Sequence, residues 1–283
     1  MKTSQWLKSA TKKLESAGIG TARLDALILL ELITELDRSK ILAEPDRDLT
    51  KGQITKLNNL LNRRVRHEPI AFIRGYTEFY GRRFVINRHV LEPRPESETM
   101  IELLLKLKKI TLQTHHSAGH HLHWSDAMAI ADVGTGSGAL GITAKLELPS
   151  NPVDLIDIDP SALKVAKSNV DLFTIPVSLI ESDLLANAPN TYDILLANLP
   201  YVPDEYHINE AAGFEPRLAI FGGPDGLDVY RRLFDQLKMA VNKPLYLLTE
   251  SLPPQHHTLQ QIALVNNYRL IDETDFIQVF SLN

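Results

Sequence analysis

One stretch decides the fold: Tyr192-Asp193-Ile194-Leu195-Leu196-Ala197-Asn198-Leu199-Pro200-Tyr201. Its first half is an apolar run that predicts a buried strand. A central strand cannot continue through Pro200, because proline has no N–H to give to a neighbouring strand. The chain must therefore turn at Asn198, where it brings together a side-chain amide, a backbone carbonyl and an aromatic ring. Open α/β sheets bind their ligands at the carboxyl ends of strands, so we expect a binding site at this turn.

Strands and helices alternate on both sides of this stretch. We predict further strands at residues 128–133, 153–157, 177–180 and 245–249, and helices at 99–109, 138–148, 160–173 and 227–241. Short apolar strands that alternate with helices are typical of a mostly parallel, doubly wound sheet. The fold class predicted for residues 99–283 is therefore α/β.

The N-terminal part follows a different pattern. Apolar residues recur at helical spacing in the segments 6–17, 21–36 and 50–67, so we expect a small helical domain over residues 1–68. Its last helix ends in the basic run Arg63-Arg64-Val65-Arg66-His67. This run suits a solvated helix end whose cations match the helix dipole, and it equally suits a contact for an acidic or nucleic-acid partner.

A bridge of different character follows at residues 69–98. Residues 76–86 alternate in polarity and predict a β-hairpin with Gly81 near its turn. After the hairpin, Pro93 and Pro95 force an extended approach to the next helix, which Glu96 or Ser97 can open.

Composition excludes several classes of protein. The 283 residues are 44% hydrophobic and 23% charged, which is ordinary for a soluble globular protein, and the net charge of −5 argues against bulk attraction to nucleic acid. The chain has no cysteine, which excludes disulfides, thiolate nucleophiles and cysteine-based zinc sites. It has neither a signal-like N-terminus nor an apolar run of about 18 residues, so we expect a cytoplasmic protein without a membrane segment.

Five histidines lie close together between His115 and His123, in the polar stretch 111–126. A metal site needs ligands that are held on rigid elements and supported by further hydrogen bonds. This polar stretch looks like a variable connection instead, so we expect no metal site.

A glycine-rich turn, Gly134-Thr135-Gly136-Ser137-Gly138, follows the first predicted strand of the sheet. Glycines allow the backbone to turn sharply and to approach a ligand closely, and the N–H groups of the next helix point at the same place. Such a turn is shared by many nucleotide-binding folds. The absence of Gly-Lys-Ser/Thr argues against a phosphate-binding Walker loop.

Carboxylates close the next two predicted strands. Asp157 is placed to accept the ribose hydroxyls of an adenosine-containing ligand, whereas Asp159 precedes Pro160 and is better suited to cap the following helix. Asp183 can accept from an adenine amino group while Leu184 packs on the ring, although Asp183 can instead cap a turn. Three strand ends thus converge on an adenosine, and the turn at Asn198 lies next to them.

Four other motifs complete the pattern. They are Glu68-Pro69-Ile70-Ala71, Pro93-Arg94-Pro95-Glu96-Ser97-Glu98, Phe214-Glu215-Pro216-Arg217-Leu218-Ala219 and Gly222-Gly223-Pro224-Asp225-Gly226-Leu227. With these motifs, nearly the whole chain resembles the class I methyltransferases that use S-adenosylmethionine. Specifically, it resembles the PrmC/HemK family of protein-(glutamine-N5) methyltransferases, which modify peptide-chain release factors. The last two motifs make the likeness specific to that family.

The resemblance implies a fold, a reaction and a set of site residues. It implies a Rossmann-like sheet that binds S-adenosylmethionine and methylates the glutamine of the Gly-Gly-Gln motif in class I release factors. Asn198 Oδ1 and the carbonyl of Leu199 would accept the two N–H groups of the glutamine amide and so hold its nitrogen in place. Asn198 and Tyr201 are the catalytic candidates, and Pro200 completes the substrate site. The implied cofactor site consists of Gly134, Thr135, Gly136, Ser137, Gly138, Asp157, Asp183, Leu184 and Asn198.

The resemblance also implies how the substrate is recognised. The helical domain and the bridge would dock the release factor, with no direct binding of nucleic acid, and the protein would act as a monomer. Two departures from the family pattern stand out. The usual Asn-Pro-Pro-Tyr is Asn198-Leu199-Pro200-Tyr201 here, which keeps the carbonyl of residue 199 and loses some rigidity. The stretches 250–254 and 275–279 lack the glycines and the arginine that the family pattern has near the last strands.

Two other functions stay open at this point. Asn-x-Pro-Tyr also occurs in enzymes that methylate amino groups of adenine or guanine in nucleic acid, which need a basic groove and a stacking platform. A non-catalytic module that binds S-adenosylmethionine is the second alternative, but such a module would have no use for amide acceptors.

Overall fold

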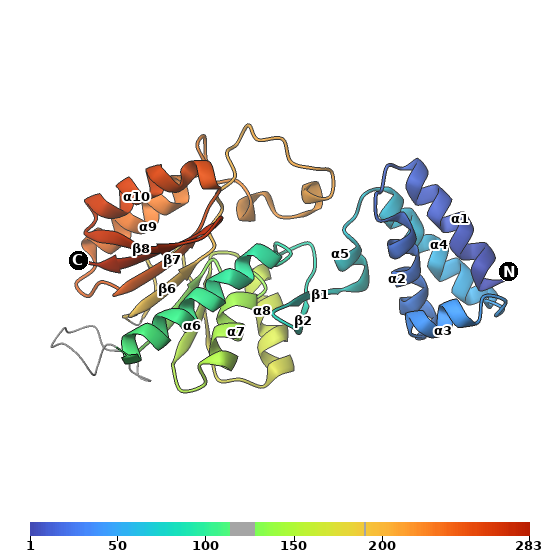
Figure 1. The fold of residues 1–283 in the computed structure, drawn as a ribbon, viewed down its shortest axis with the longest axis horizontal. Coiled ribbons are helices and arrows are strands. Elements are labelled where there is room, and N and C mark those ends of the chain that lie inside the picture. The colour runs from blue at the N-terminus through green and yellow to red at the C-terminus, as the bar shows by residue number, and fades with distance from the viewer. Residues whose placement is uncertain (114–127, 190) are drawn as a thin grey trace. The chain divides into compact units, whose positions relative to one another are not determined.

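The computed structural model describes residues 1–113, 128–189 and 191–283 (Figure 1). The chain forms two compact units. Residues Met1–Tyr76 with Ile208–Phe214 make the first, and Thr77–His207 with Glu215–Asn283 make the second. The histidines at 115–123 lie outside the described residues. The three-part division at 1–68, 69–98 and 99–283 stays a prediction.

The first unit is helical. Its helices are α1 (Thr3–Ser16), α2 (Ala22–Thr34), α3 (Arg38–Ala43), α4 (Lys51–Val65) and α5 (Ile70–Arg74). Thr50 caps α4 in a reciprocal pair with Gln53, in which each side chain accepts from the backbone N–H of the other. Trp6, Leu14 and Leu57 are buried between the helices, as their helical spacing predicts.

Ion pairs engage most of the basic run at the end of α4. Arg63 pairs with Glu68, and Arg64 pairs with the buried carboxylate of Asp25 at 2.7 Å. His67 Nε2 lies 2.9 Å from Glu210. The structure thus assigns Arg63 and Arg64 to the packing of this unit.

The second unit contains a sheet of seven strands. These are β3 (Ile130–Val133), β4 (Val153–Asp157), β5 (Ser178–Glu181), β6 (Ile194–Ala197), β7 (Tyr246–Glu250), β8 (Tyr268–Glu273) and β9 (Ile277–Leu282). Their order is β5-β4-β3-β6-β7-β9-β8. The first five run parallel, and β9 is antiparallel to both β7 and β8. The predicted α/β class and mostly parallel sheet are confirmed.

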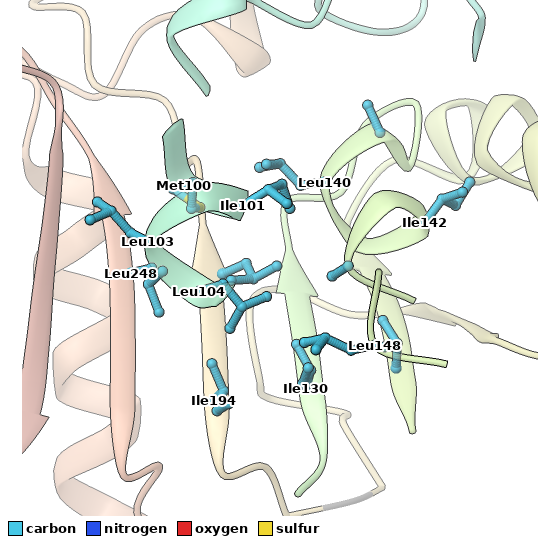
Figure 2. Close-up of a cluster of buried hydrophobic side chains, with 14 of the residues drawn as sticks. Met100, Ile101, Leu103, Leu104, Ile130, Leu140, Ile142, Leu148, Ile194 and Leu248 are labelled. Atoms are coloured by element: carbon cyan, nitrogen blue, oxygen red, sulfur yellow. The ribbon is translucent and has the colours of Figure 1, made fainter. Parts of the chain in front are cut away.

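Helices cover both faces of the sheet (Figure 1). On one face lie α6 (Glu98–Gln113), α7 (Ala139–Glu147) and α8 (Pro160–Phe173), and on the other lie α9 (Asp228–Met239) and α10 (His256–Val265). Figure 2 shows Met100 and Leu104 of α6 against Ile130, Ile194 and Leu248 of three strands. Successive side chains of a strand point to opposite faces of the sheet, and both faces are covered by helices. The central strands are therefore buried on both sides.

A short hairpin of β1 (Tyr76–Phe79) and β2 (Arg82–Val85) precedes α6, as predicted. Tyr80 and Gly81 form its turn, both with positive φ. Asn169 of α8 holds Val85 through hydrogen bonds to its backbone N–H and carbonyl. The strand β2 therefore attaches the hairpin to α8.

The strand order decides where a ligand can bind. The chain leaves β3 for β4 and β5 on one side and returns to β6 on the other side of β3. Such a reversal opens a crevice at the carboxyl ends of the two central strands. None of the helices that the structure describes is long and apolar enough to cross a lipid bilayer.

Candidate active site

A pocket lies at the carboxyl ends of β3, β4 and β6. It is lined by most of the residues predicted for cofactor and substrate, namely Gly134, Thr135, Gly136, Ser137, Asp157, Asp183, Leu184, Asn198, Leu199 and Pro200. Gly138 and Tyr201 do not line it. Gly138 is the N-cap residue of α7, and Tyr201 directs its hydroxyl to Glu250.

The glycine-rich turn needs its glycines for backbone conformation. Gly134, Gly136 and Gly138 all have positive φ, which side chains disfavour. A Cβ on Gly134 would lie 3.1 Å from the Leu199 side chain, whereas one on Gly136 would meet no atom within 4 Å. Gly136 lines the pocket, so its backbone faces open space there.

The side chain of Asp132 stabilises this turn through hydrogen bonds. Its Oδ2 atom accepts hydrogen bonds from Thr135 Oγ1 at 2.6 Å and from the backbone N–H of Gly141 at 2.8 Å. The side chain is buried, and that burial raises the pKa of Asp132 to about 6. Sequence reasoning missed this residue, although a carboxylate inside the apolar strand 128–133 was a usable signal.

Asp157 faces the pocket from the end of β4. Its two oxygens accept from the backbone N–H groups of Gly136 at 2.8 Å and Asp159 at 2.9 Å. Burial raises the pKa of Asp157 above the ordinary aspartate value, and these hydrogen bonds oppose the rise. Asp159 caps α8 by accepting from Ser161 N, so its predicted role as a helix cap is confirmed. The assignment of Asp157 to the ribose stays a prediction.

Asp183 and Leu184 lie at the pocket edge after β5. The carboxylate of Asp183 pairs with Arg232, which also lines the pocket. It does not cap the following turn, where Ala186 N donates to the backbone carbonyl of Asp183 instead. Leu184 is buried, lines the pocket and has a φ of 53°, in the left-handed region.

The side-chain amide of Asn198 is held by its nitrogen. Nδ2 donates to Ser97 Oγ at 2.9 Å and to Glu250 Oε2 at 3.0 Å. The other carboxylate oxygen of Glu250 accepts from the Tyr201 hydroxyl at 2.9 Å. Burial, followed by the Glu250 charge, raises the pKa of Tyr201 well above the ordinary tyrosine value, so its hydroxyl remains a donor.

A buried tyrosine supports the backbone of the same turn. The Tyr230 hydroxyl lies 2.8 Å from the carbonyl of Ala197 and 2.6 Å from that of Glu250. The backbone N–H groups of Glu250 and Leu199 point at the same oxygen, at 3.2 and 3.4 Å. Tyr230 thus links the ends of β6 and β7.

Two of the motifs outside the strand ends meet at Glu215. Its carboxylate is buried and accepts from Arg94 Nη2 at 2.6 Å and from Glu92 N at 3.1 Å. Burial raises the pKa of Glu215, and the Arg94 charge opposes that effect. The neighbours Pro216 and Leu218 line the pocket, so this ion pair anchors one wall of it.

The glycine motif at 222–227 packs against the turn at Asn198. A Cβ on Gly222 would lie 2.3 Å from the carbonyl oxygen of Pro200, and one on Gly226 would lie 2.0 Å from that of Tyr201. Gln255 Nε2 donates to the same Tyr201 carbonyl at 2.7 Å. Ser97, Tyr230, Glu250 and Gln255 therefore support the turn, and sequence reasoning assigned none of them to the site.

Family comparisons agree with this architecture. A family model described as the PrmC N-terminal domain matches residues 5–75, and one described as the methyltransferase small domain matches residues 119–213. The release factor glutamine methyltransferase of Koribacter versatilis is 35% identical over 242 residues, which are 84% of this chain and 81% of that protein. The chain belongs to the release factor glutamine methyltransferase family.

Other relatives cover the chain more fully. The Coxiella burnetii release factor glutamine methyltransferase is 30% identical over 272 residues, 94% of this chain and 93% of that protein. The bifunctional methyltransferase of Rickettsia bellii is 30% identical over 93% of this chain, which spans about half (51%) of its length. Among solved structures, the hMettl16 catalytic domain in complex with the MAT2A 3′UTR hairpin 6 matches with a TM-score of 0.52. That match is 12% identical and covers 71% of this chain and 74% of the other, so it supports the methyltransferase fold alone.

Proposed function

We propose that this protein transfers a methyl group from S-adenosylmethionine to the side-chain nitrogen of the glutamine in the Gly-Gly-Gln motif of class I peptide-chain release factors. The observation that carries the proposal is the amide of Asn198, which is held by its nitrogen beside a pocket at the carboxyl end of β6. Family membership supports the same reaction.

The pocket fits S-adenosylmethionine. The glycine-rich turn offers backbone without side chains, and Asp157 offers a carboxylate whose position is fixed by two N–H groups. We assign the ribose to Asp157 and the adenine to Asp183 and Leu184, with Gly134, Thr135, Gly136, Ser137 and Gly138 around the rest of the cofactor. When bound, the cofactor supplies an electrophilic methyl group on a sulfonium.

The protein's own contribution is position. An amide nitrogen is a weak nucleophile because its lone pair is delocalised into the carbonyl, and no covalent intermediate is needed. Asn198 Oδ1 and the carbonyl of Leu199 would each accept one N–H of the substrate amide, which orients its nitrogen. The Leu199 side chain is buried, with the residue 2% exposed, and it packs near Gly134. The proposal gives this side chain no role toward the substrate and requires only the carbonyl of Leu199.

The partners follow from the same proposal. The helical unit and the hairpin would recognise the release factor, since one glutamine side chain cannot account for selectivity. We expect no direct nucleic-acid binding, a monomer and a cytoplasmic location. Among the pocket residues that the structure describes, Arg232 is the only arginine or lysine, and it is paired with Asp183. This arrangement lacks the basic groove that methylation of a nucleic-acid base would need.

The test is direct. The protein is incubated with S-adenosylmethionine and a class I release factor, and the site of methylation is mapped by mass spectrometry. Methyl on the Gly-Gly-Gln glutamine supports the proposal, and an unmodified glutamine with methyl on added RNA or DNA overturns it.

A further inference from the structure

Glu250 occupies a costly position at the end of β7. Its side chain is buried, with the whole residue 1% exposed, and it has no arginine or lysine among its hydrogen-bond partners in the described residues. Its carboxylate accepts from Asn198 Nδ2 at 3.0 Å and from the Tyr201 hydroxyl at 2.9 Å. Burying a carboxylate without a cation is unfavourable, and a glutamine of the same shape would avoid the charge. Packing alone therefore does not explain why a carboxylate rather than an amide lies at position 250.

The reason lies in the symmetry of an asparagine side chain. The oxygen and nitrogen of the amide are nearly equal in size, so only their hydrogen-bond partners determine which one faces the pocket. An ionised carboxylate has no hydrogen to give, and therefore it accepts only from Nδ2. Ser97 adds a second acceptor for the same nitrogen at 2.9 Å. The amide oxygen of Asn198 is then the end left over for a substrate.

We propose that Glu250 is a positioning residue that fixes the Asn198 side chain with its oxygen toward the substrate glutamine. The proposal rests on the proposed function, because it assumes that Asn198 Oδ1 accepts a substrate N–H. Glutamine at position 250 can donate as well as accept, so it would stabilise both orientations of Asn198. A flipped Asn198 would present N–H groups to the N–H groups of the substrate amide, which is repulsive.

The ionisation of Glu250 gives the proposal a second consequence. Burial raises the pKa of Glu250, and hydrogen bonds from Ser97, Tyr201 and Asn198 oppose the rise. The negative charge of Glu96 raises the pKa of Glu250 further. Arg94 acts electrostatically on Tyr201, which bonds Glu250, and Tyr230 on α9 contacts the Glu250 backbone. Protonated Glu250 can donate to Asn198 Oδ1, so turnover should fall as the pH drops through the pKa of this carboxyl.

The kinetic test compares Glu250→Gln with the wild-type chain, using S-adenosylmethionine and a class I release factor. We expect kcat to fall about 10-fold to 100-fold, by analogy with the loss of a residue that orients a metal-binding side chain. The KM for the release factor and the Kd for S-adenosylmethionine should stay unchanged, and the acid limb that Glu250 causes in the pH profile of kcat should disappear. Unchanged kcat, or an acid limb identical to that of the wild type, would overturn the proposal.

A second measurement needs neither turnover nor a folded variant at position 250. In a ¹⁵N-labelled wild-type protein, the side-chain NH₂ signals of Asn198 are identified by their absence in Asn198→Ala. We expect slow exchange with water at neutral pH and a shift as Glu250 becomes protonated. Rapid exchange with no such shift would contradict the inferred orientation. If the wild-type protein leaves the release factor unmodified, the proposed function fails on its own, and these spectra still test the role of Glu250.

Discussion

The side-chain nitrogen of Asn198 lies 3.0 Å from Oε2 of Glu250, although the two residues are 52 positions apart in the sequence. The register of two parallel strands explains the contact. Ala197 of β6 pairs with Thr249 of β7. Asn198 and Glu250, which follow these two residues, therefore lie at the same edge of the sheet. The orientation of the proposed substrate-binding amide thus depends on how the sheet is assembled, in addition to the turn in which Asn198 lies.

Replacing Asn198 with alanine should separate turnover from cofactor binding. The variant lacks the acceptor for one substrate N–H. Removing one hydrogen-bond donor from an oxyanion hole costs about 10²-fold to 10³-fold in kcat, and we expect a fall of similar size here. The Kd for S-adenosylmethionine, measured by calorimetry, should remain measurable because Asp157 and the glycine-rich turn are untouched. Asn266→Ala, which removes an amide at the C-terminal cap of α10 away from the pocket, is the matched control and should keep full activity. Full activity in Asn198→Ala would show that the acceptor role is wrong.

Replacing Gly226 with alanine should disturb the turn at Tyr201. The new Cβ would lie 2.0 Å from the Tyr201 carbonyl oxygen and would hold a φ of 81°. The left-handed conformation alone costs about 1–2 kcal/mol, and the clash adds to this. We expect a lower melting temperature and a fall in kcat. The control is Gly52→Ala in α4, where a Cβ meets no atom within 4 Å and helix propensity favours alanine by up to about 1 kcal/mol. Equal effects at the two glycines would refute the close approach at Gly226.

Removing the Arg94 side chain should expose the cost of burying Glu215. The carboxylate would keep only the hydrogen bond from Glu92 N, and a buried acceptor that loses a partner costs about 1–3 kcal/mol. We expect Arg94→Ala to lower the free energy of unfolding measured in urea. Adding Glu215→Gln to that variant removes the unpaired charge and should restore part of the loss. If the double variant is no more stable than Arg94→Ala, the ion pair is not what stabilises this wall of the pocket.

Asp132 should make stability depend on pH. The folded protein holds the proton of Asp132 up to about pH 6, whereas the ordinary aspartate pKa is 3.8. Between these values the folded state binds more protons than the unfolded state, so the free energy of unfolding falls as the pH rises through this window. Calorimetry from about pH 4 to pH 7 should show that the free energy of unfolding falls less for Asp132→Asn than for the wild type. The unfolding transition to follow is the one that added S-adenosylmethionine moves to higher temperature. Identical pH dependence in the two proteins would contradict a proton on Asp132.

The strand ends could be predicted from the sequence because their signals are local. Pro200 stops β6, the glycines turn the chain after β3, and Asp159 with Pro160 starts α8. These features need only neighbouring residues, and they were enough to predict the five parallel strands and part of the pocket lining.

The supporting residues could not be found in this way, because their partners are distant in the sequence. Ser97 was assigned only to the start of a helix, whereas its hydroxyl contacts Asn198, 101 positions away. Glu250 was noted only as part of the stretch 250–254, which lacks the glycines of the family pattern. The final strands β8 and β9 form an antiparallel pair, with β9 inserted next to β7, and this order depends on tertiary pairing rather than on any local turn signal.

The central claim is that Asn198 holds a substrate glutamine for methylation. The most direct measurement is mass spectrometry of a class I release factor after incubation with this protein and S-adenosylmethionine, with added RNA and DNA in the same reaction. The account predicts one methyl group on the glutamine of the Gly-Gly-Gln motif, present with the wild-type protein and absent with Asn198→Ala. An unmodified glutamine, with methyl on the nucleic acid instead, would contradict it.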